Sequence, residues 1–374
     1  MSKLVYKAYR FRLYPNKNQR VQMAKTFGSV RFVYNHFLDE WNTSYKTTGK
    51  GLSESRCKKD LPLLKTAFSF LKEVDSIALQ SACEDLAEAF GNFFAGRANK
   101  PVFKSKKRKQ FSYTTKFTNG NIALFDKSIK LPKLGLVRAK ISRVPTGRIM
   151  RATVSMRPNG HYYVSILVEE EVQPFAKTKQ TVGLDMGIAH LVTTSDGVHI
   201  AHPHAFSKHE KKLARAQRTL SRRIERAKKE GRDIKHAKNI QKARLKVANI
   251  HERISNIRRD YVHKLTTEFV RDYDIIAVEK LTVSAMLAYK PLAKSIADAS
   301  WSMIREQLAY KCEWYDKTFI GIEPAYTSQT CANCHTVDKT SRKGQLFTCK
   351  ACGHTDHADV NASKNIKRLA LASL

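Results

Sequence analysis

Four cysteines near the C-terminal end of the chain restrict its fold more than any other feature. They form two C-x2-C pairs, Cys331 with Cys334 and Cys349 with Cys352, with fourteen residues between the pairs. Four thiolates at this spacing suit a tetrahedral Zn²⁺ ion, although the gap is slightly shorter than is usual for such sites. A redox-active pair would need a thioredoxin-like setting, which the sequence lacks. We therefore predict a closed, structural zinc site at these four residues.

The position after each cysteine pair also bears on this site. A zinc-binding loop turns tightly after its second cysteine, and glycine adopts such a turn without steric cost. Gly353 follows the second pair, whereas His335 occupies the equivalent position after the first. Because four thiolates are available, we treat His335 and His354 as bystanders rather than ligands.

The large positive charge of the chain narrows the classes of partner. The sequence has 68 Lys and Arg against 33 Asp and Glu, a formal net charge of +35. Such a surplus opposes compaction by self-repulsion, so we expect an anionic partner. Nucleic acid is the first candidate, because each neutralised phosphate releases counterions. An anionic membrane surface and a ribosomal-type structural role are the alternatives.

The sequence offers no segment that would enter a membrane. No apolar run approaches the roughly 20 residues of a spanning helix, and residues 1–4 do not open a signal peptide. Three further cysteines, Cys57, Cys83 and Cys312, stand alone in helix-like segments, as is usual in a reducing compartment. We expect a soluble protein of the cytoplasm with no membrane partner.

The hydrophobic period changes twice in the first half of the chain. Residues 7–15 alternate basic and apolar side chains, which predicts a strand. From 18 to 94 apolar residues recur at spacings of three, four and seven, which predicts a helical bundle inserted after that strand. A basic linker at 100–109 is either a solvated run or a loop that contacts phosphates. From 111 to 171 the period is two, which predicts a small β-barrel that the first strand completes.

Beyond a linker at 174–180 the pattern is α/β. Strands are predicted at 181–188, 191–194, 198–200, 274–279 and 319–322, and helices at 208–269 (a hairpin with its tip at 230–233), 298–314 and 359–372. Between Lys208 and Asp260 there are 19 Lys or Arg against 6 Asp or Glu. A charged helix face is usually only solvated, but the dominance of one sign favours contact with an RNA or DNA backbone.

Three acids lie where apolar strands end or a helix begins. Asp185 follows an apolar strand, Glu279 ends another, and Asp359 begins the last helix. Taken singly, they read as a turn residue, a surface acid and an acid favoured by the helix dipole. Taken together, they match a ribonuclease-H-like order of elements, so we expect them to converge.

Converging acids indicate metal-dependent chemistry. Hydrolysis of a phosphodiester needs a deprotonated water and a stabilised leaving oxygen, and two Mg²⁺ ions roughly 3.5–4 Å apart supply both. Mg²⁺ prefers carboxylate oxygens and water as ligands. Without metal, clustered carboxylates repel one another and one pKa rises. If the fold brings the three acids together, the sequence therefore predicts a nuclease.

The sequence resembles the TnpB family, the transposon-encoded RNA-guided DNA nucleases ancestral to the type V CRISPR effectors. The resemblance spans nearly the whole chain. It rests on residues 9–15, 31–35, 183–187, 278–281, 301–305, 324–331 and 356–362. The last two blocks, which adjoin the cysteines, are highly specific.

This resemblance implies a fold and a catalytic site. It implies a RuvC-like nuclease domain at 180–374 with a zinc ribbon inserted at 324–358, preceded by a β-barrel wedge domain at 1–15 and 100–175. That barrel would carry a helical recognition domain at 16–99. The implied triad is Asp185, Glu279 and Asp359, which would hold Mg²⁺ or Mn²⁺, and the ribbon would hold structural Zn²⁺.

The resemblance also implies partners: a guide RNA and a double-stranded target DNA, read by base pairing and by a short motif beside the target. By position, Gln80 and a Thr114-Thr115 loop resemble the parts that read this motif. Together with the basic segments above, the expected nucleic-acid contacts are Gln80, Thr115, Lys104, Lys106, Arg222, Arg223 and Arg226. We expect a monomer associated with a prokaryotic nucleoid.

Two other classes of function compete with an RNA-guided endonuclease. The first is an RNA-guided DNA-binding repressor, and the second is a transposition-associated DNA-binding protein without cleavage, or a transposase that acts by strand transfer. Loss of an acid would favour the repressor, but all three acids are present. A plain basic scaffold protein fits least well, because it explains neither the acids nor the cysteine pairs.

Overall fold

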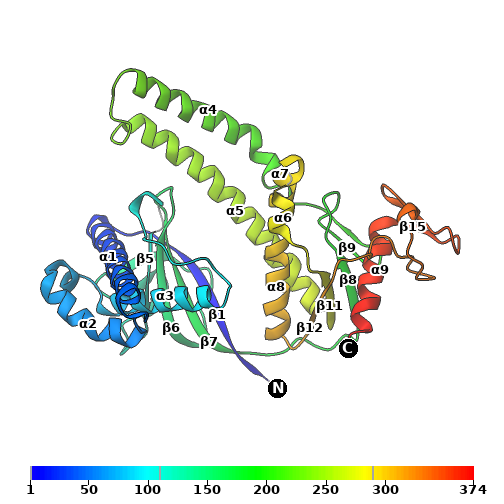
Figure 1. Ribbon diagram of the computed structural model, residues 1–374, viewed down its shortest axis with the longest axis horizontal. Coiled ribbons are helices and arrows are strands. Elements are labelled where there is room, and N and C mark those ends of the chain that lie inside the picture. The colour runs from blue at the N-terminus through cyan, green and yellow to red at the C-terminus, as the bar shows by residue number, and fades with distance from the viewer. Residues whose placement is uncertain (1, 109–110, 289) are drawn as a thin grey trace. The chain divides into compact units, whose positions relative to one another are not determined.

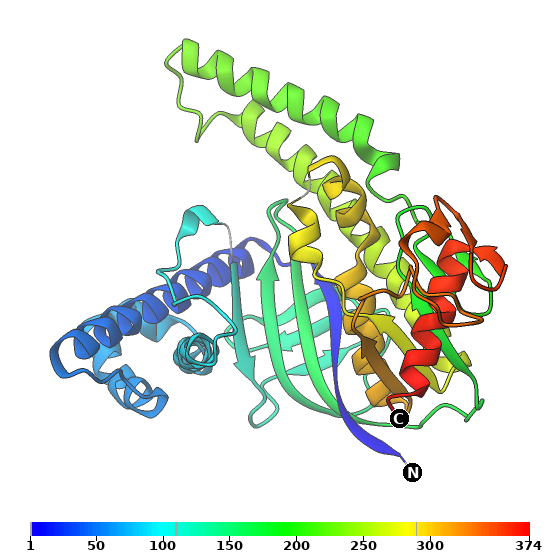
Figure 2. The same ribbon diagram turned by 45° about the vertical axis from the view of Figure 1, so that its right-hand side comes forward.

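The computed structural model describes residues 2–108, 111–288 and 290–374 (Figures 1 and 2). The chain divides into two compact units. The N-terminal unit spans Leu4–Glu171, and the C-terminal unit spans Val172–Leu374 together with the first residues of the chain. Over the described residues, no helix combines the length and the apolar character needed to cross a membrane.

The N-terminal unit combines helices with one antiparallel sheet. Its helices are α1 (Lys17–Thr48), α2 (Glu54–Ala67) and α3 (Ser76–Phe94), with short 3-10 turns at Ser69–Glu73 and Lys106–Arg108. Its strands are β1 (Lys3–Leu13), β2 (Phe111–Lys116), β3 (Ala123–Phe125), β4 (Ser128–Leu131), β5 (Gly135–Lys140), β6 (Arg148–Met156) and β7 (Tyr162–Val172). The helical segment expected at 18–94 and the strand-rich segment expected at 111–171 are thus confirmed.

The seven strands form a sheet in the order β2-β6-β7-β1-β5-β4-β3. The N-terminal strand β1 therefore lies between β7 and β5, two strands that are far from it in the sequence. Figure 2 shows the long strands of this sheet side by side, with α3 (cyan) seen end-on next to them. Over the residues that the structure describes, no ladder joins β2 to β3, so the hydrogen-bonded order is open where a closed barrel was expected.

Side-chain caps fix the beginnings of the three helices. Asn16 accepts a hydrogen bond from the backbone N–H of Gln19, whose side chain in turn accepts one from the N–H of Asn16. This reciprocal pair satisfies two donors that a helix end otherwise leaves free. Ser53 and Asp75 cap α2 and α3 in the same way through their side-chain oxygens. Each helix therefore begins at the polar residue that ends the preceding turn.

The C-terminal unit is α/β. Its strands are β8 (Thr181–Asp185), β9 (Val192–Thr194), β10 (His199–Ile200), β11 (Ile275–Glu279), β12 (Thr318–Ile322), β13 (Arg342–Lys343), β14 (Leu346–Thr348) and β15 (Thr355–His357). Its helices are α4 (Ser207–Lys229), α5 (Lys238–Asp272), α6 (Val283–Leu287), α7 (Lys290–Ala299), α8 (Trp301–Trp314) and α9 (Ala358–Leu371), with a 3-10 turn at Lys339–Ser341.

The larger sheet of this unit has the order β10-β9-β8-β11-β12. Strand β11 is parallel to both β8 and β12, whereas β8, β9 and β10 form an antiparallel meander. Helices α5 and α8 pack with the apolar side of this sheet, and α9 packs on β8, β9, β11 and β12. Figure 1 shows α8 and α9 with the strands of the sheet between them.

A helical hairpin extends from this sheet. Helices α4 and α5 lie antiparallel (Figure 1) and share a small core of Leu213, Ala216, Ile250 and Ile254. This narrow apolar stripe leaves most of α4 exposed to solvent. The hairpin that the sequence predicted at 208–269 is confirmed.

The segment before α8 differs from the prediction. A single helix was expected from Asp298 to Trp314, but Asp298 belongs to α7, and Ser300 has φ of 59°, in the left-handed region. Asp298 accepts hydrogen bonds from the backbone N–H of Phe206 and from Arg258. These contacts fix α7 to the start of α4 and to α5, so tertiary contacts break the helix that the sequence pattern would continue. Helices α6 and α7 carry no clear capping signal and were not predicted.

Candidate acid site and cysteine ribbon

The alternation of side chains along β8 directs Asp185 to the face of the sheet that α9 covers. Val182 and Leu184 belong to the core shared with α5 and α8, and both are fully buried. Successive side chains in a strand point to opposite faces, so Gly183 and Asp185 point to the other face. An apolar strand that ends in an acid on the far face is the pattern from which the sequence predicted this site.

Strand β11 repeats the arrangement beside it. Ile276 and Val278 lie in the core with α5 and α8, whereas Ala277 packs with α9. Glu279 therefore projects on the same face as Ala277. The parallel register pairs Val278 with Leu184, and the two acids directly follow these paired residues. The sheet thus places Asp185 and Glu279 side by side at the ends of adjacent strands.

Helix α9 brings the third acid to this face because Gly183 allows very close packing. A Cβ atom at Gly183 would lie 2.1 Å from the carbonyl oxygen of Ser363 and 2.6 Å from the amide nitrogen of Lys367. The backbones of β8 and α9 are therefore in direct contact. Asp359 lies in the first turn of α9, where His357 caps the helix by accepting the N–H of Asp359 through its Nδ1 at 3.3 Å.

The electrostatics of Asp185 show that the three acids are close enough to interact. Burial, and then the charges of Glu279 and Asp359, raise the pKa of Asp185 to about 7, while Arg342 opposes this rise. Burial also raises the pKa of Glu279, which is 8% exposed, while a hydrogen bond from Thr327 and the charge of Arg342 oppose it. Without a metal ion, the site therefore has too little positive charge to offset its carboxylates, as is expected where carboxylates cluster.

Arg342 is the cation nearest to the acids, and sequence reasoning did not identify it. Its guanidinium donates a hydrogen bond to Asp359 at 2.8 Å, and its charge lowers the pKa values of both Asp185 and Glu279. Arg342 lies between the two cysteine pairs among Lys339, Lys343 and Lys350, and no sequence signal separates it from them. Only the fold reveals that it faces the acids.

Thr327 is a second residue that the prediction missed. It is 2% exposed, and its hydroxyl donates a hydrogen bond to the carboxylate of Glu279, with the carbonyl oxygen of Pro324 3.1 Å from the same hydroxyl. A hydrogen bond to the charged form of a carboxylate favours that form. Thr327 therefore orients Glu279 and partly offsets the effect of its burial.

In the part of the chain that the structure describes, the four cysteines are the only group of three or more His, Cys, Asp or Glu side chains close enough to hold a single ion. Asp185, Glu279 and Asp359 do not form such a group in this structure.

The four cysteines converge as predicted. We call residues 324–357, which hold them and the small sheet β13-β14-β15, the cysteine ribbon. Their four sulfur atoms lie within 4.8 Å of one another, with 3.7 Å between Cys331 and Cys352 and 3.5 Å between Cys334 and Cys349. A tetrahedron with Zn–S of about 2.3 Å has S···S edges of about 3.8 Å, so this sulfur cage fits Zn²⁺ closely.

Both loops of the cysteine ribbon turn tightly after their second cysteine. Gly353 has φ of 72° and His335 has φ of 64°, so each occupies the left-handed region. The N–H of His335 donates to the carbonyl of Cys331, and the N–H of Gly353 donates to the carbonyl of Cys349. The two loops thus have the same turn, and His335 adopts it although glycine would do so with less strain.

The predicted motif-reading residues differ in accessibility. Gln80 is exposed on α3, where it could contact a ligand. Thr115 is not in a loop: it lies within β2, pairs with Ala152 of β6, and is fully buried. Because alternate residues of a strand face opposite sides, Thr115 points into the core while Thr114 points outward and hydrogen-bonds with Thr153 at 3.0 Å. The prediction that Thr115 contacts nucleic acid is therefore wrong for this conformation.

Lys104 and Lys106 also differ. The ammonium of Lys104 lies 3.7 Å from the centre of the Tyr34 ring and 3.8 Å from Asp85, and its backbone is hydrogen-bonded to the Asn35 side chain. Burial lowers the pKa of this ammonium. Lys104 is therefore held against the helical bundle, but 37% of its side chain is exposed, so its contact with a phosphate stays a prediction. Lys106 is exposed and stays a candidate contact.

The three arginines predicted on the basic hairpin are all exposed on α4. Arg222 and Arg226 are one turn apart and share a face. Arg223 points to another side and donates a hydrogen bond to the carbonyl of Asn239 at 2.7 Å, which links α4 to α5. Arg222 and Arg226 thus remain candidate phosphate contacts, whereas Arg223 has a structural partner.

Profiles of known families match most of the chain. The IS605 OrfB profile, described as "Probable transposase", matches residues 165–290, and the "Cas12f1-like, TNB domain" profile matches residues 301–366. A "Helix-turn-helix domain" profile of the same IS605 OrfB group matches residues 1–50, where the structure has β1 followed by the uninterrupted helix α1. The first two profiles between them cover the acids Asp185, Glu279 and Asp359 and all four cysteines.

Two curated proteins are similar over nearly their whole length. "Putative RNA-guided DNA endonuclease InsQ" of Escherichia coli strain K12 is 37% identical over 381 residues, covering 96% of this chain and 91% of that protein. A "Putative RNA-guided DNA endonuclease" of Streptomyces pristinaespiralis is 36% identical over 389 residues, covering 100% of this chain and 91% of that protein.

A solved structure has a similar fold. The matching chain of a cryo-EM structure titled "Cas12f1-sgRNA-target DNA complex" gives a TM-score of 0.64 at 13% sequence identity. The match covers 97% of this chain and 99% of that chain. At so low an identity the likeness establishes the fold, and it extends over both compact units.

Proposed function

The chain belongs to the IS605 OrfB (TnpB) family, and from this premise we propose that it is an RNA-guided DNA endonuclease that cuts by metal-dependent hydrolysis. The observation that carries the proposal is the interaction of Asp185, Glu279 and Asp359 on one face of the α/β sheet. A protein that only bound DNA would have no use for buried carboxylates that repel one another. The relatives named above as RNA-guided DNA endonucleases support the same function.

In this proposal Asp185, Glu279 and Asp359 hold two Mg²⁺ or Mn²⁺ ions. Bound ions would activate a water and neutralise charge on the scissile phosphate. The raised pKa of Asp185 fits this role, because a carboxyl that keeps its proton without metal gives it up when a cation binds. Thr327 orients Glu279, and Arg342 donates a hydrogen bond to Asp359.

The cysteine ribbon in this proposal holds one structural Zn²⁺ through Cys331, Cys334, Cys349 and Cys352. The hydrogen bond between Cys334 and Thr336 is the largest cause that lowers the pKa of Cys334 to about 6, which favours the thiolate that a metal requires. With four sulfur ligands and no open position, the ion would serve folding rather than chemistry.

We propose that the exposed arginines of α4 contact the guide RNA. Arg222 and Arg226 share one exposed helix face, and within the described residues neither side chain makes an ion pair or a hydrogen bond. Base pairing with the guide would select the target, and the protein would read duplex shape and a short adjacent motif. Gln80 on α3 is the candidate reader of that motif, and Lys106 is a candidate contact to a phosphate.

We also propose a role for each domain of the chain. Residues 1–15 and 100–175 would form the wedge domain, 16–99 the recognition domain, and 180–374 the nuclease domain with its ribbon at 324–358. We propose that the protein acts as a monomer in the prokaryotic cytoplasm, together with nucleoid DNA. Sedimentation of the RNA-bound protein would test the oligomeric state.

The test uses the protein purified together with its RNA. That RNA is sequenced, and a duplex that matches its guide is supplied with Mg²⁺. We expect cleavage that stops with EDTA and with Asp185→Asn, and that persists with Asp316→Asn, since Asp316 is 70% exposed and far along the chain from the acids. Binding of the matched duplex without any cutting would support the repressor instead, and joining of ends without a guide would support a transposase.

A further inference from the structure

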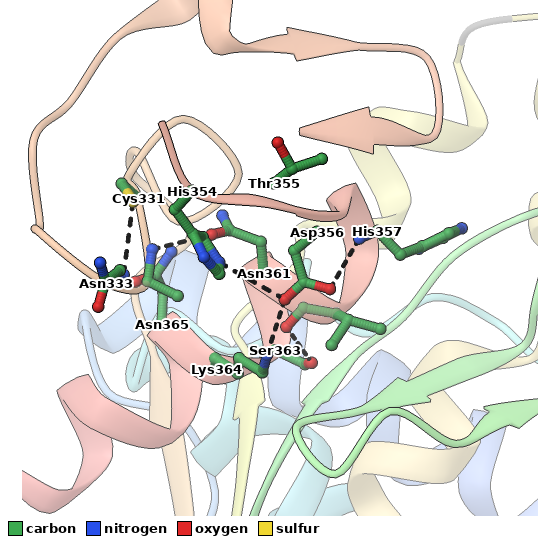
Figure 3. Close-up of polar contacts among 12 residues, drawn as sticks. Cys331, Asn333, His354, Thr355, Asp356, His357, Asn361, Ser363, Lys364 and Asn365 are labelled. Atoms are coloured by element: carbon green, nitrogen blue, oxygen red, sulfur yellow. Dashed lines mark hydrogen bonds and ion pairs between the residues drawn. The ribbon is translucent and has the colours of Figure 1, made fainter. Parts of the chain in front are cut away.

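Helix α9 holds the cysteine ribbon through a buried side-chain amide. The Nδ2 of Asn361 donates to the carbonyl of Thr330 at 2.7 Å, and its Oδ1 accepts the N–H of Ala332 at 2.8 Å. Asn361 is 0% exposed. Its amide therefore pairs with the backbone on both sides of Cys331, which lies between Thr330 and Ala332. Figure 3 shows Asn361 on α9 close to Cys331.

Asn365 adds a second pair of hydrogen bonds one turn along the helix. Its Nδ2 donates to the carbonyl of Thr330 at 2.7 Å and to that of Thr327 at 3.0 Å, and the residue is 1% exposed. Residues four apart on a helix share a face, so Asn361 and Asn365 act on the same stretch of the ribbon. We call these two side chains the amide clamp.

The amide clamp connects a cysteine ligand to two of the acids. On the helix side, Asn361 lies two residues after Asp359. On the ribbon side, the clamped Thr327 donates its hydroxyl to Glu279. Within the ribbon, Arg342 donates to Asp359. Glu279 and Asp359 thus each have a hydrogen-bond partner from the ribbon, and the clamp fixes the segment that joins Thr327 to Cys331.

We propose that the amide clamp makes the position of the acids depend on the metal in the cysteine ribbon, so that Asn361 is a positioning residue for the acid site. This inference rests on the proposed function, in which the acids bind divalent ions. A metal that ties Cys331 to the three other cysteines fixes the backbone at Thr330 and Ala332. Through the clamp, that fixed backbone holds α9 and with it Asp359 at a set position relative to Glu279.

The chemistry of the side chain is specific. Asparagine offers one donor and one acceptor, which is what the backbone on either side of Cys331 requires. Aspartate at this position would keep the acceptor for Ala332 but lose the donor for Thr330. Alanine would leave the N–H of Ala332 without this partner in a buried place, and the carbonyl of Thr330 would keep only the hydrogen bond from Asn365. Either change should therefore weaken the hold of α9 on the ribbon, and aspartate would in addition place a buried carboxylate against the Thr330 carbonyl.

The coupling can be measured as metal binding, apart from activity. Electron paramagnetic resonance of free Mn²⁺ gives the affinity of the acids in the zinc-loaded, RNA-bound protein. We expect Asn361→Ala to bind Mn²⁺ about 10- to 100-fold more weakly, the usual effect of removing a residue that orients metal ligands. The variant should keep one zinc per chain. Asn256→Ala is the matched control, because Asn256 is an exposed asparagine of α5, outside both the cysteine ribbon and α9.

Linkage provides a second measurement. If zinc and Mn²⁺ sites are coupled, each metal raises the affinity for the other by the same factor. Saturating Mg²⁺ should then raise the zinc affinity, measured at equilibrium against a chelator, in the wild-type protein and leave it unchanged in Asn361→Ala. Thr327→Val removes the hydroxyl at Glu279 and should weaken Mn²⁺ binding. If Asn361→Ala does not fold, the effect of Mg²⁺ on zinc affinity is measured in Thr327→Val instead, where coupling predicts that it becomes smaller than in the wild type.

The outcomes separate this inference from the proposed function. If the wild-type protein binds Mn²⁺ but Asp185→Asn binds it equally well, the acids are not the metal site and the proposed function fails. If Asp185→Asn loses Mn²⁺ while both Asn361→Ala and Thr327→Val bind it as the wild type does, the function stands and the coupling is refuted.

Discussion

The substitution Gly183→Ala is the sharpest test of how the acid site is assembled. Gly183 lies in β8, two residues before Asp185, and faces α9. An added Cβ would lie 2.1 Å from the Ser363 carbonyl oxygen, whereas ordinary contacts begin at 3.4 Å. Strand and helix must therefore separate by about 1.3 Å at this point. Both atoms in conflict with the methyl group belong to the backbone of α9, so no side-chain rotation can relieve the clash.

The displacement should affect rate more than stability. Overpacking of this kind costs about 1–3 kcal/mol of unfolding free energy. Since Asp359 begins the displaced helix while Asp185 stays on the strand, the two acids move apart. A misplacement of about 1 Å at a catalytic group can lower a rate by about 100-fold. We therefore expect a folded variant that cuts slowly.

The assay is single-turnover cleavage of a matched duplex by the RNA-bound protein, together with thermal unfolding. Gly28→Ala is the matched control: Gly28 lies within α1, and an added Cβ there would meet nothing within 4 Å. Alanine inside a helix should stabilise by about 0.5–1 kcal/mol, with cleavage unchanged. Wild-type cleavage and stability in Gly183→Ala would show that the close contact of β8 with α9 does not set the geometry of the acids.

Three further predictions concern charge and strain. The pKa of Asp185 is about 7, so the metal-free folded protein keeps a proton that the unfolded chain loses near pH 4. Unfolding free energy should therefore fall as pH rises from 4 to 7 and then level off, and Asp185→Asn should lack this component in pH-dependent denaturation. Arg342→Ala removes the cation that lowers the pKa values of Asp185 and Glu279, so Mn²⁺ titrations should show binding only at higher pH, with Arg342→Lys close to the wild type. His335→Gly relieves a left-handed histidine and should slow zinc loss to a chelator slightly, with stability changed by at most about 1 kcal/mol.

The acids could be predicted from sequence because strand geometry leaves a readable pattern. An apolar strand that ends in an acid places that acid at the sheet edge, and the period of two determines which face it occupies. Asp185 and Glu279 both fit this pattern beside core residues such as Leu184 and Val278. What the sequence could not provide was the distance between them, since it depends on the register of β8 with β11.

The partners of the acids could not be predicted, because nothing local marks them. Arg342 is one basic residue among many in a chain of net charge +35. Thr327 and Asn361 lie in blocks that supported the family resemblance, yet their roles depend on contacts across 48 and 31 residues of sequence. For Thr115 the error is the opposite one. Its position in the family resemblance assigned it a contact with nucleic acid, but Thr115 is buried in β2 and cannot make that contact.

The net positive charge of the protein also affects the binding of metal ions at the acid site. A protein of net charge +35 repels divalent cations, and this repulsion weakens their binding to Asp185, Glu279 and Asp359. Bound RNA neutralises much of the surplus, since every contacted phosphate carries a negative charge. Exposed arginines such as Arg222 are screened by salt over about 8 Å, whereas the buried acids are screened far less. On the proposed function, guide RNA would therefore do more than select a target, because it would also lower the electrostatic cost of loading the metal.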